Sequence, residues 1–387
     1  MDDEVFTDLL VEARAGAAER ERRRELPRDL VSRLTAAGLP SARVPAEHGG
    51  EGADLVTVFD RLVRLARADS NVAHVFRGHL AFVEKQLFET DEDVRARWFA
   101  RFRDGRLVGN AVSESGGTSD VSTALREADG RLLLTGRKFY TTGCLYADWI
   151  DTSATWDGAA VQVSVPTGAA GVEVVDDWKG FGQRLTGSGT TTFTDVEVDR
   201  AEVRPVDPDD DLQTYLLGFF QLVLLAVSAG IAHAALDDAV EFVRPRTRVF
   251  GYAGQVRPRE HDLVQAVVGD LSSAASVARA VVLHAARTLD AAQRAHRGGA
   301  AGSPDALREA QLEVYRAQQV VLPLVVRATS DLFEVGGASA TDVDLGLDRH
   351  WRNARTIATH NPAVHRKRAI GDWELNRTPT RRYLPAG

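Results

Sequence analysis

The hydrophobic period of this chain changes twice, and this change restricts its fold more than any other feature. Among the first hundred or so residues, Leu55, Phe59, Leu62 and Ala66 recur at intervals of four, three and four. An apolar stripe with this spacing predicts an amphipathic helix. Around residue 107 short β-prone runs replace the helical period, which returns at about Asp211 and continues to about residue 370. The sequence therefore predicts helices, then a β region, then helices again.

The middle of the chain consists of short β-prone runs separated by turn signals. Asp129-Gly130 and Asp157-Gly158 are dipeptides typical of tight turns. The predicted strands are Arg131–Leu134, Ala160–Val165, Val172–Val175 and Thr190–Val198. Alternation in the last run predicts that Phe193 and Asp195 lie on the same face.

These patterns predict an α+β protein with three parts. We expect an N-terminal helical domain over residues 1–106, a central β domain over 107–207 and a helical bundle over 208–387. Within the bundle, Gly298–Ser303 reads as a loop between two long helices. A chain of 387 residues is long enough for two or three packed regions. Helices and strands do not alternate as βαβ units, which argues against a doubly wound parallel sheet.

Composition and short motifs exclude several classes of protein. A net charge of −8 gives no general attraction to nucleic acid or to an anionic membrane. Cys144 is the only cysteine, so we expect neither an internal disulfide nor a Cys-based metal site, and a reducing cytoplasm is the simplest location. The polar N-terminus lacks the pattern of a signal peptide. Without G-x-G-x-x-G after a strand or a P-loop, the chain has no evident nicotinamide or nucleoside-triphosphate site of its own.

The segment Tyr215–Ala235 is apolar enough to raise the question of membrane insertion. Gln221, Ser228 and His233 interrupt it, and Asp237 follows closely. A single membrane-spanning helix tolerates such groups poorly. We therefore interpret the segment as a buried core helix.

Two segments carry residues suited to a flat, phosphorylated ligand. Gly109–Asp120 reads GNAVSESGGTSD, a strand leading into a glycine-rich loop whose amides and hydroxyls can approach a ligand closely. Gly136–Trp149 reads GRKFYTTGCLYADW, with an aromatic residue and two threonines at a strand end. From the residues alone, an ordinary surface turn and an ordinary strand end remain equally open.

Together these segments resemble the flavin-binding strands of the acyl-CoA dehydrogenase superfamily, in which T-E-P-x-A-G-S-D is followed by K-x-W-I-T-N. Ser113 takes the place of the threonine that hydrogen-bonds the flavin ring in that family. The other matching positions are Glu114, Ser119, Asp120, Lys138, Tyr140 and Thr142. The resemblance covers nearly the whole chain. It implies an N-terminal helical domain, a central β-barrel or sandwich and a C-terminal four-helix bundle.

Two further strings resemble the flavin monooxygenase branch of this superfamily, which includes dibenzothiophene monooxygenase and dimethylsulfone-type monooxygenases. Asp177–Phe193 reads DWKGFGQRLTGSGTTTF, and Asp348–His360 reads DRHWRNARTIATH. The corresponding strings of the branch read F-G-Q-R-x-T-x-S-G-T and L-D-R-H-W-R-N-A-R-T. The resemblance therefore favours an oxygenase over an acyl-CoA dehydrogenase.

The position of the dehydrogenase base points in the same direction. Dehydrogenases need a carboxylate to remove the proton α to the thioester carbonyl. Aligning residues 352–355 with the family's R-D-A-K places Asn361 where that glutamate stands, and an amide cannot serve as the base. Some dehydrogenases supply the base from an earlier helix, but Phe242–Arg259 contains no Asp or Glu.

Histidines offer the alternative chemistry. In the oxygenase branch, histidines matching His360 and His79 flank the reacting face of the flavin, where reduced flavin and O2 form a C4a-hydroperoxide. The resemblance therefore makes these two residues the catalytic candidates. We expect His74, His350 and His365 to be structural or exposed.

The resemblance also implies the flavin contacts. Ser113 and Thr142 would hold the ring edge, and Tyr140 would cover its face. Ser188 and Arg248 would bind the phosphate end. The remaining cofactor-binding candidates are Ser119, Arg246, Arg352 and Asn353. Residues 244–248 resemble a segment that reaches the flavin of a neighbouring subunit, which implies a homotetramer.

We thus expect a two-component flavin-dependent monooxygenase that receives reduced FMN, or alternatively FAD, from a separate flavin reductase. Its substrate would be a small molecule in which sulfur or an amine nitrogen attacks the peroxide oxygen. Two alternatives stay open: an acyl-CoA dehydrogenase or oxidase with a relocated base, and a non-catalytic relative that keeps the fold. The first would be reduced by an acyl-CoA without a reductase, and the second would bind no flavin.

Overall fold

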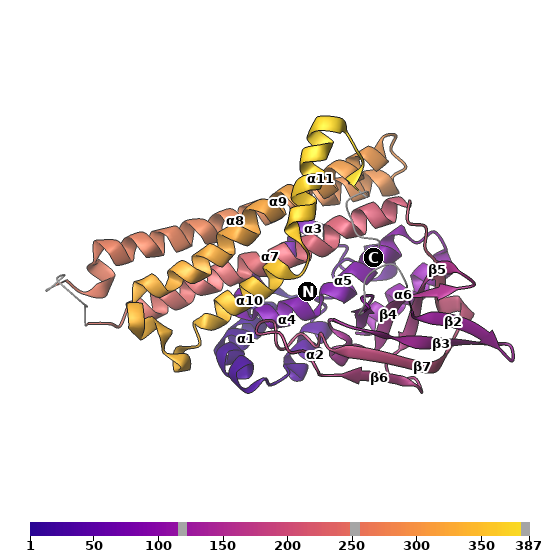
Figure 1. The fold of residues 1–387 in the computed structure, drawn as a ribbon, viewed down its shortest axis with the longest axis horizontal. Helices are drawn as coiled ribbons and strands as arrows, with labels where there is room; N and C mark the ends of the chain where they lie inside the picture. Colours follow the sequence, from indigo (N-terminus) through magenta and orange to yellow (C-terminus); the bar gives the residue numbers. More distant parts are fainter. Residues whose placement is uncertain (115–121, 248–255, 381–387) are drawn as a thin grey trace.

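The computed structural model describes residues 1–114, 122–247 and 256–380, and its elements follow the predicted order (Figure 1). The helices before the sheet are α1 (Asp3–Arg23), α2 (Arg28–Ala36), α3 (Leu55–Ala68), α4 (Ser70–Val75), α5 (Arg77–Phe88) and α6 (Glu92–Arg103). The strands are β1 (Val108–Ala111), β2 (Ala124–Ala128), β3 (Arg131–Lys138), β4 (Trp149–Trp156), β5 (Ala159–Pro166), β6 (Val172–Val175), β7 (Thr190–Val198) and β8 (Val203–Pro205). The helices after the sheet are α7 (Asp211–Val243), α8 (Asp262–Arg297), α9 (Ser303–Asp331), α10 (Asp348–Thr359) and α11 (Ala363–Asn376).

The apolar stripe that begins at Leu55 forms helix α3, and all four of its residues are buried. The side chain of Asp54 caps the helix by accepting a hydrogen bond from the backbone N–H of Thr57. Helix α3 packs on α7 where Gly230 meets Ala66, and a side chain on this glycine would collide with Ala66. The N-terminal helices therefore pack closely on the bundle at this point.

The strands form one mixed sheet in the order β6-β7-β3-β2-β4-β5-β8, with β1 paired in parallel to β4. The predicted strands are confirmed, and Asp129 and Asp157 adopt positive φ in the two predicted turns. Asp195 departs from the predicted alternation. It has a φ of +47° and is exposed, whereas Phe193 is buried, and the pairing of β3 with β7 shifts register opposite it. A bulge thus separates the two residues, and the prediction that they share a face was wrong.

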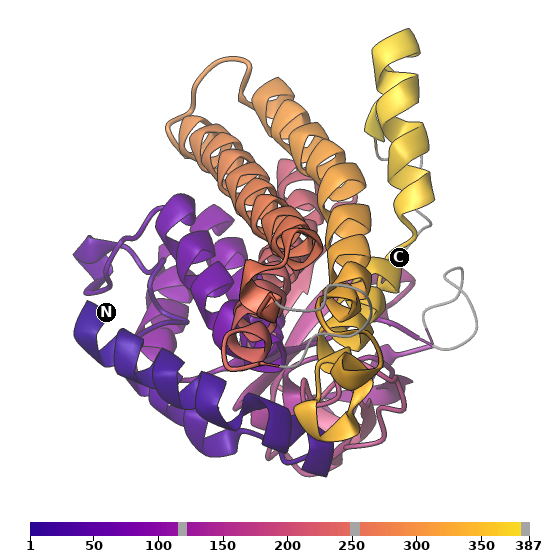
Figure 2. The same cartoon turned by 90° about the vertical axis from the view of Figure 1, so that its left-hand side faces the viewer.

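Helices α7, α8 and α9 run the length of the bundle (Figures 1 and 2). Both α7 and α8 are long and apolar enough to cross a membrane. The most apolar stretch of α7 is 89% buried inside the chain, which confirms the interpretation of Tyr215–Ala235 as a core helix. The corresponding stretch of α8 is only 28% buried, so one apolar face of this helix is uncovered in the single chain. The chain between α8 and α9 forms the loop predicted at Gly298–Ser303.

Three elements meet where the sheet joins the bundle. The chain leaves β3 through Gly143, whose φ of +85° brings it against the carbonyl of Val75 in α4, where a side chain would collide. Helix α10 packs on α7 and α9 and ends at the same junction, while α11 stands beside the bundle (Figure 2). The end of β3, the α4–α5 segment and the end of α10 therefore position the candidate site.

Candidate active site

The chain beyond β3 presents an aromatic ring in a constrained backbone. Tyr140 has a φ of +58°, which is uncommon for a residue with a side chain, and 61% of its surface is exposed. Its ring lies 5.8 Å from the ring of Trp178, edge to face. Ser113 lies on the neighbouring segment, where its carbonyl accepts a hydrogen bond from the N–H of Phe139 and its side chain is exposed. Ser113 and Tyr140 thus form one accessible edge.

A buried ion pair supports this edge from inside. Lys138 is fully buried, and its Nζ donates to Glu114 at 2.5 Å. Burial alone would raise the pKa of Glu114, but hydrogen bonds from Lys138, Ser122 and Thr123 outweigh burial and lower this pKa to about 2. Burial also lowers the pKa of Lys138. The carboxylate therefore ties three segments together directly beside Ser113.

A chain of buried hydroxyl groups lies next to this edge. Thr142 Oγ1 lies 2.8 Å from Ser188 Oγ, which lies 2.7 Å from Thr186 Oγ1. Each hydroxyl can donate one hydrogen bond and accept others, so the chain can turn a donor toward a ligand. Ser188 thus lies directly beside Thr142, and its predicted contact with the phosphate end of the cofactor stays a prediction.

The loop that carries these hydroxyls is held by α10. Asn353 is buried, its Oδ1 accepts from the N–H of Gln183 at 2.5 Å, and its Nδ2 donates to Glu21 at 2.8 Å. Arg352 donates to Glu21, to Asp348 and to the carbonyl of Phe181. Both residues therefore hold the loop through these hydrogen bonds, and their contact with the cofactor stays a prediction.

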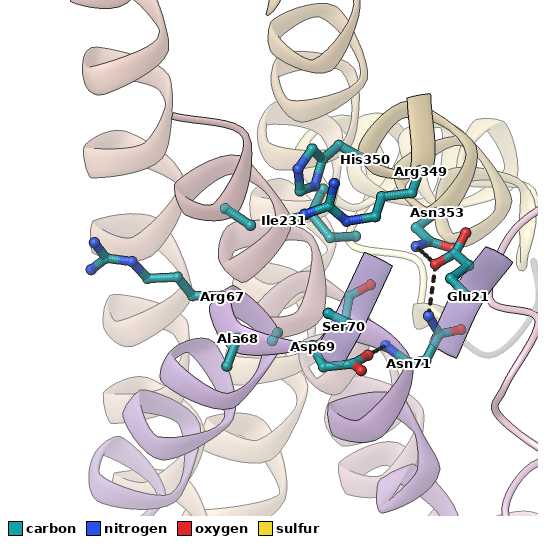
Figure 3. A pocket seen from close by; sticks show the side chains of 13 residues that line it. Glu21, Arg67, Ala68, Asp69, Ser70, Asn71, Ile231, Arg349, His350 and Asn353 are labelled. Carbon is teal, nitrogen blue, oxygen red and sulfur yellow. Dashed lines mark hydrogen bonds between the residues drawn. The ribbon is translucent and has the colours of Figure 1, made fainter. Parts of the chain in front are cut away.

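Glu21 is the centre of this support (Figure 3). Its carboxylate accepts from Asn353 and, at 3.0 Å, from Asn71 in α4, so it joins α1, α4 and α10. The hollow between these helices is also lined by His350 and Arg349 and has room for about one water molecule. This hollow is too small for a cofactor and forms part of the support of the site.

The structure brings His360 next to His74, not next to His79. The His74 and His360 rings lie 6.1 Å apart between centroids. His74 is buried, and its Nδ1 lies 2.9 Å from Oε1 of Gln183, in the same loop as Ser188. Because an amide oxygen only accepts, this contact places a proton on Nδ1 of His74. The His74–His360 pair therefore links α4, the hydroxyl loop and the end of α10.

Both rings are neutral near pH 7. Burial, followed by the charge of Arg77, lowers the pKa of His74 to about 3. His360 keeps exposed surface, but protein surrounds its imidazole on the side facing Arg77 and His74. This desolvation, with the charge of Arg77, lowers the pKa of His360 well below its ordinary value. A neutral imidazole has one nitrogen that donates a hydrogen bond and one that accepts, each at a fixed atom.

His79 lies elsewhere in the core. It is buried, its Nδ1 accepts from the N–H of Val108 at 3.1 Å, and its ring packs edge to face on Phe102 at 5.2 Å. These contacts are with β1 and α6, and the catalytic role of His79 stays a prediction. His74 and His79 are five positions apart, so on a helical segment their side chains point about 140° apart around the axis.

Asn361, which occupies the expected base position, belongs to an amide network. Its Nδ2 donates to Oε1 of Gln221 at 3.2 Å, and Gln318 donates to the same oxygen at 3.3 Å. The described atoms around His360 are thus amides, imidazoles and guanidinium groups.

The remaining predicted residues lie away from the His74–His360 pair or outside the described residues. His350 is buried against Asp238, at 2.7 Å, which agrees with a structural role, and His365 is exposed. Arg246 lies with its guanidinium 4.3 Å from the centre of the Phe242 ring of its own chain. The candidates outside the described residues are Ser119, Asp120 and Arg248.

The described residues fit a flat heteroaromatic cofactor. Tyr140 offers an exposed ring face and Ser113 an exposed hydroxyl. Within the described part of the chain, the Nε2 atom of His74 is buried without a hydrogen-bond partner. A buried polar atom in this state calls for a ligand or an ordered water molecule. Sequence reasoning missed His74, Gln183 and Arg77, although Gln183 lies inside the F-G-Q-R string.

Comparison with known proteins gives the family. The family profile described as "Acyl-CoA dehydrogenase, N-terminal domain" matches residues 6–106, and "Acyl-CoA dehydrogenase, C-terminal domain" matches residues 222–364. Dibenzothiophene monooxygenase of Rhodococcus qingshengii is 30% identical, over 96% of this chain and 92% of the relative. "Probable FMNH2-dependent monooxygenase SfnC" of Pseudomonas putida is also 30% identical, over 93% and 91%.

Solved structures agree with these relatives. FMN-bound TdsC from Paenibacillus sp. A11-2 superposes with a TM-score of 0.89 at 28% identity, covering 97% of each chain. Methanesulfinate monooxygenase MsuC from Pseudomonas fluorescens gives a TM-score of 0.89 at 28% identity, covering 99% of this chain and 100% of the other. The similarity extends over all three parts of the fold.

Proposed function

The chain belongs to the acyl-CoA dehydrogenase family, and we propose that it is a two-component flavin-dependent monooxygenase that oxygenates a small sulfur compound. The relatives named above are described as monooxygenases, and two of those names contain sulfur substrates. Reduced FMN and O2 would supply one oxygen atom to the substrate sulfur and one to water, while the flavin gives up two electrons and two protons.

The observation that carries this proposal is the composition of the end of α10. A dehydrogenase requires a carboxylate base beside the reacting carbon. Here the corresponding position holds Asn361, which is engaged with Gln221, and the neighbouring rings are His360 and His74. This set can position a proton and a substrate but offers no carboxylate for removing an α-proton.

We assign the remaining roles on the same basis. Tyr140 would stack on the flavin ring, and the Ser113 and Thr142 hydroxyls would lie along its edge. Ser188 and Arg248 remain the proposed contacts of the phosphate end, and Ser119 and Arg246 remain proposed cofactor contacts. His360, with His74, would hold or donate the proton needed at the reacting face and exclude water from it.

The cofactor and the redox partner follow from the relatives and from the sequence. SfnC is described as FMNH2-dependent, and TdsC was solved with FMN, which supports FMN over FAD. The chain carries no evident nicotinamide motif. A separate flavin reductase is therefore the proposed source of reduced FMN, in the cytoplasm.

We also propose a homotetramer. The uncovered apolar face of α8 includes Leu263 and Val277, which are 72% and 46% exposed. Apolar residues exposed along a helix face are typical of an interaction site, and a second copy of the same chain is the proposed partner. Residues 244–248, which precede α8, would reach the neighbouring subunit's flavin in that assembly.

The test is oxygen incorporation. Purified protein is supplied with FMN, a flavin reductase, NADH and ¹⁸O2, and sulfur compounds are analysed by mass spectrometry. We expect one ¹⁸O atom per product molecule and no product without the reductase. Anaerobic bleaching of bound flavin by an acyl-CoA would instead support the dehydrogenase alternative, and failure to bind any flavin would support a non-catalytic relative.

A further inference from the structure

Two buried arginines lie beside the His74–His360 pair. Arg77, in the first turn of α5, donates to the carbonyl of Phe220 at 3.3 Å, and its guanidinium lies 4.7 Å from the centre of that ring. Arg366, in the first turn of α11, is also buried and lies 5.3 Å from the centre of the Tyr315 ring. The charge of Arg77 acts on both histidine rings, and the charge of Arg366 acts on His360 and on Arg77. Arg77 contacts Phe220, and the next residue, Gln221, accepts the hydrogen bond of Asn361, which follows His360. The two arginines and the two neutral imidazoles thus lie in one region, and the arginines carry its positive charge.

The two arginines have no carboxylate partner within residues 1–114, 122–247 and 256–380, where neither takes part in an ion pair. Arg43 gives the contrast, because it is equally buried and pairs with Glu84 and Asp290. Burial, followed by repulsion from the charge of Arg366, lowers the pKa of Arg77 to about 10. Burial also lowers the pKa of Arg366. A buried charge without a carboxylate partner is costly, which indicates that these two arginines have a role other than stabilising the fold.

Unsatisfied polar atoms point to the same place. In the described residues, Oε1 of Gln318 and Nε2 of His74 are buried without a hydrogen-bond partner. They come from α9 and α4. Gln318 donates to Gln221, which also accepts from Asn361 beside His360, and the His360 ring lies 6.1 Å from that of His74, so both unused groups belong to one region. Buried groups of this kind are normally satisfied by ligand or by ordered water.

We propose that Arg77 and Arg366 form an oxyanion subsite beside His360, and that the substrate is a small organosulfur anion. This inference rests on the proposed function, because it names the substrate class of the same site. A sulfinate meets both needs: its sulfur keeps a lone pair for attack on oxygen, and its oxygens accept charge-assisted hydrogen bonds. A neutral thioether would leave both guanidinium groups unpaired. The neutrality of His74 and His360 leaves the two arginines as the anion-binding charges.

Binding is tested on the FMN-loaded full-length protein by isothermal titration with methanesulfinate and with uncharged dimethyl sulfone. We expect methanesulfinate to bind more tightly than the sulfone. Arg77→Gln and Arg366→Gln should each weaken sulfinate binding roughly 10- to 100-fold and leave sulfone binding unchanged. Arg355→Gln, at an exposed position of α10, is the matched control and should bind sulfinate as the wild type does. Thermal melts of all variants, with Arg366→Lys as a charge-conserving variant, separate lost binding from lost folding.

The outcomes distinguish the two proposals. Equal affinity for sulfone and sulfinate, or wild-type sulfinate affinity in both Gln variants, would overturn the anion subsite. If a neutral thioether were then oxygenated at the expense of reduced FMN, the monooxygenase assignment would stand without the subsite. If sulfinate bound through the arginines but no sulfur compound were oxygenated, the subsite would stand and the proposed activity would fall.

Discussion

The imidazole of His74 lies 6.1 Å from that of His360, although the two residues come from opposite parts of the chain. One belongs to α4 and the other follows α10, and Gln183 fixes the first ring from the loop between the sheet strands. Both pKa values are lowered, so the pair is neutral when the arginines around it are charged. A pair of neutral imidazoles can hydrogen-bond the reacting atoms without adding a charge that would attract or repel an anion.

His360→Ala should reduce product formation while FMN binding and thermal stability hold. Loss of a group that holds or donates a proton typically costs about 10²- to 10⁴-fold in rate. Oxygen consumption should continue, with hydrogen peroxide released in place of oxygenated product, so the ratio of peroxide to product is the measurement. His74→Ala should change that ratio in the same direction, with a less than additive double variant. If His360→Ala gave the wild-type ratio of peroxide to product, the catalytic site would have to lie elsewhere in the protein.

His79 should affect stability and its dependence on pH. Burial lowers the pKa of His79 from 6.5 to about 4, so between these values the unfolded chain binds more protons than the folded one. Stability should therefore fall as the pH falls from about 6.5 to about 4, by up to about 3 kcal/mol from this residue. His79→Gln should make the urea midpoint of unfolding fall less steeply between pH 7 and pH 5 than in the wild type. His365→Gln, on the exposed surface, should keep the wild-type dependence of the midpoint on pH.

Asn361→Glu should not create an acyl-CoA dehydrogenase. The new carboxylate would lose the amide hydrogen bond to Gln221 and enter a region built around Arg77. Stopped-flow absorbance under anaerobic conditions should show no flavin bleaching by an acyl-CoA in the wild type or in the variant. Rapid bleaching of the wild-type flavin would contradict the oxygenase assignment.

A charge on α8 should break the proposed assembly. Val277→Asp places a carboxylate on the uncovered apolar face and should shift the protein from tetramer toward smaller species in light scattering. Val11→Asp, at a position 66% exposed on α1, is the matched control and should leave the mass unchanged. A wild-type monomer that binds FMN with full affinity would exclude a shared flavin site.

Lys138→Met should destabilise the β region and weaken FMN binding. Removing one partner of a buried ion pair leaves the other uncompensated and costs about 3–5 kcal/mol. Lys138 is fully buried against Glu114, next to Ser113. Because the pKa of Glu114 is depressed to about 2, the pair stabilises the fold above about pH 4.5 and this contribution is lost as the pH falls toward 2. Urea unfolding measures the effect, and the exposed Lys179→Met should unfold as the wild type does.

The sequence by itself determined the order of the elements and the family of the fold. Periodicity is local, so the stripe at Leu55 and the core helix at Tyr215–Ala235 could be read directly from spacing. Residues at the strand end, such as Tyr140 and Thr142, were found because the motif that contains them is contiguous. The bulge at Asp195 could not be predicted from spacing, because a shift in strand register depends on the partner strand.

Only the tertiary structure decided which side chains meet. His74 and His79 are five positions apart, which separates their directions by about 140° on a helical segment, and one ring meets His360 while the other meets Phe102. Arg352 and Asn353 matched a flavin motif, but Glu21, distant in sequence, takes up their hydrogen bonds. Hydrogen bonds and burial are set by three-dimensional neighbours, and periodicity along one chain carries no information about which distant residues those are.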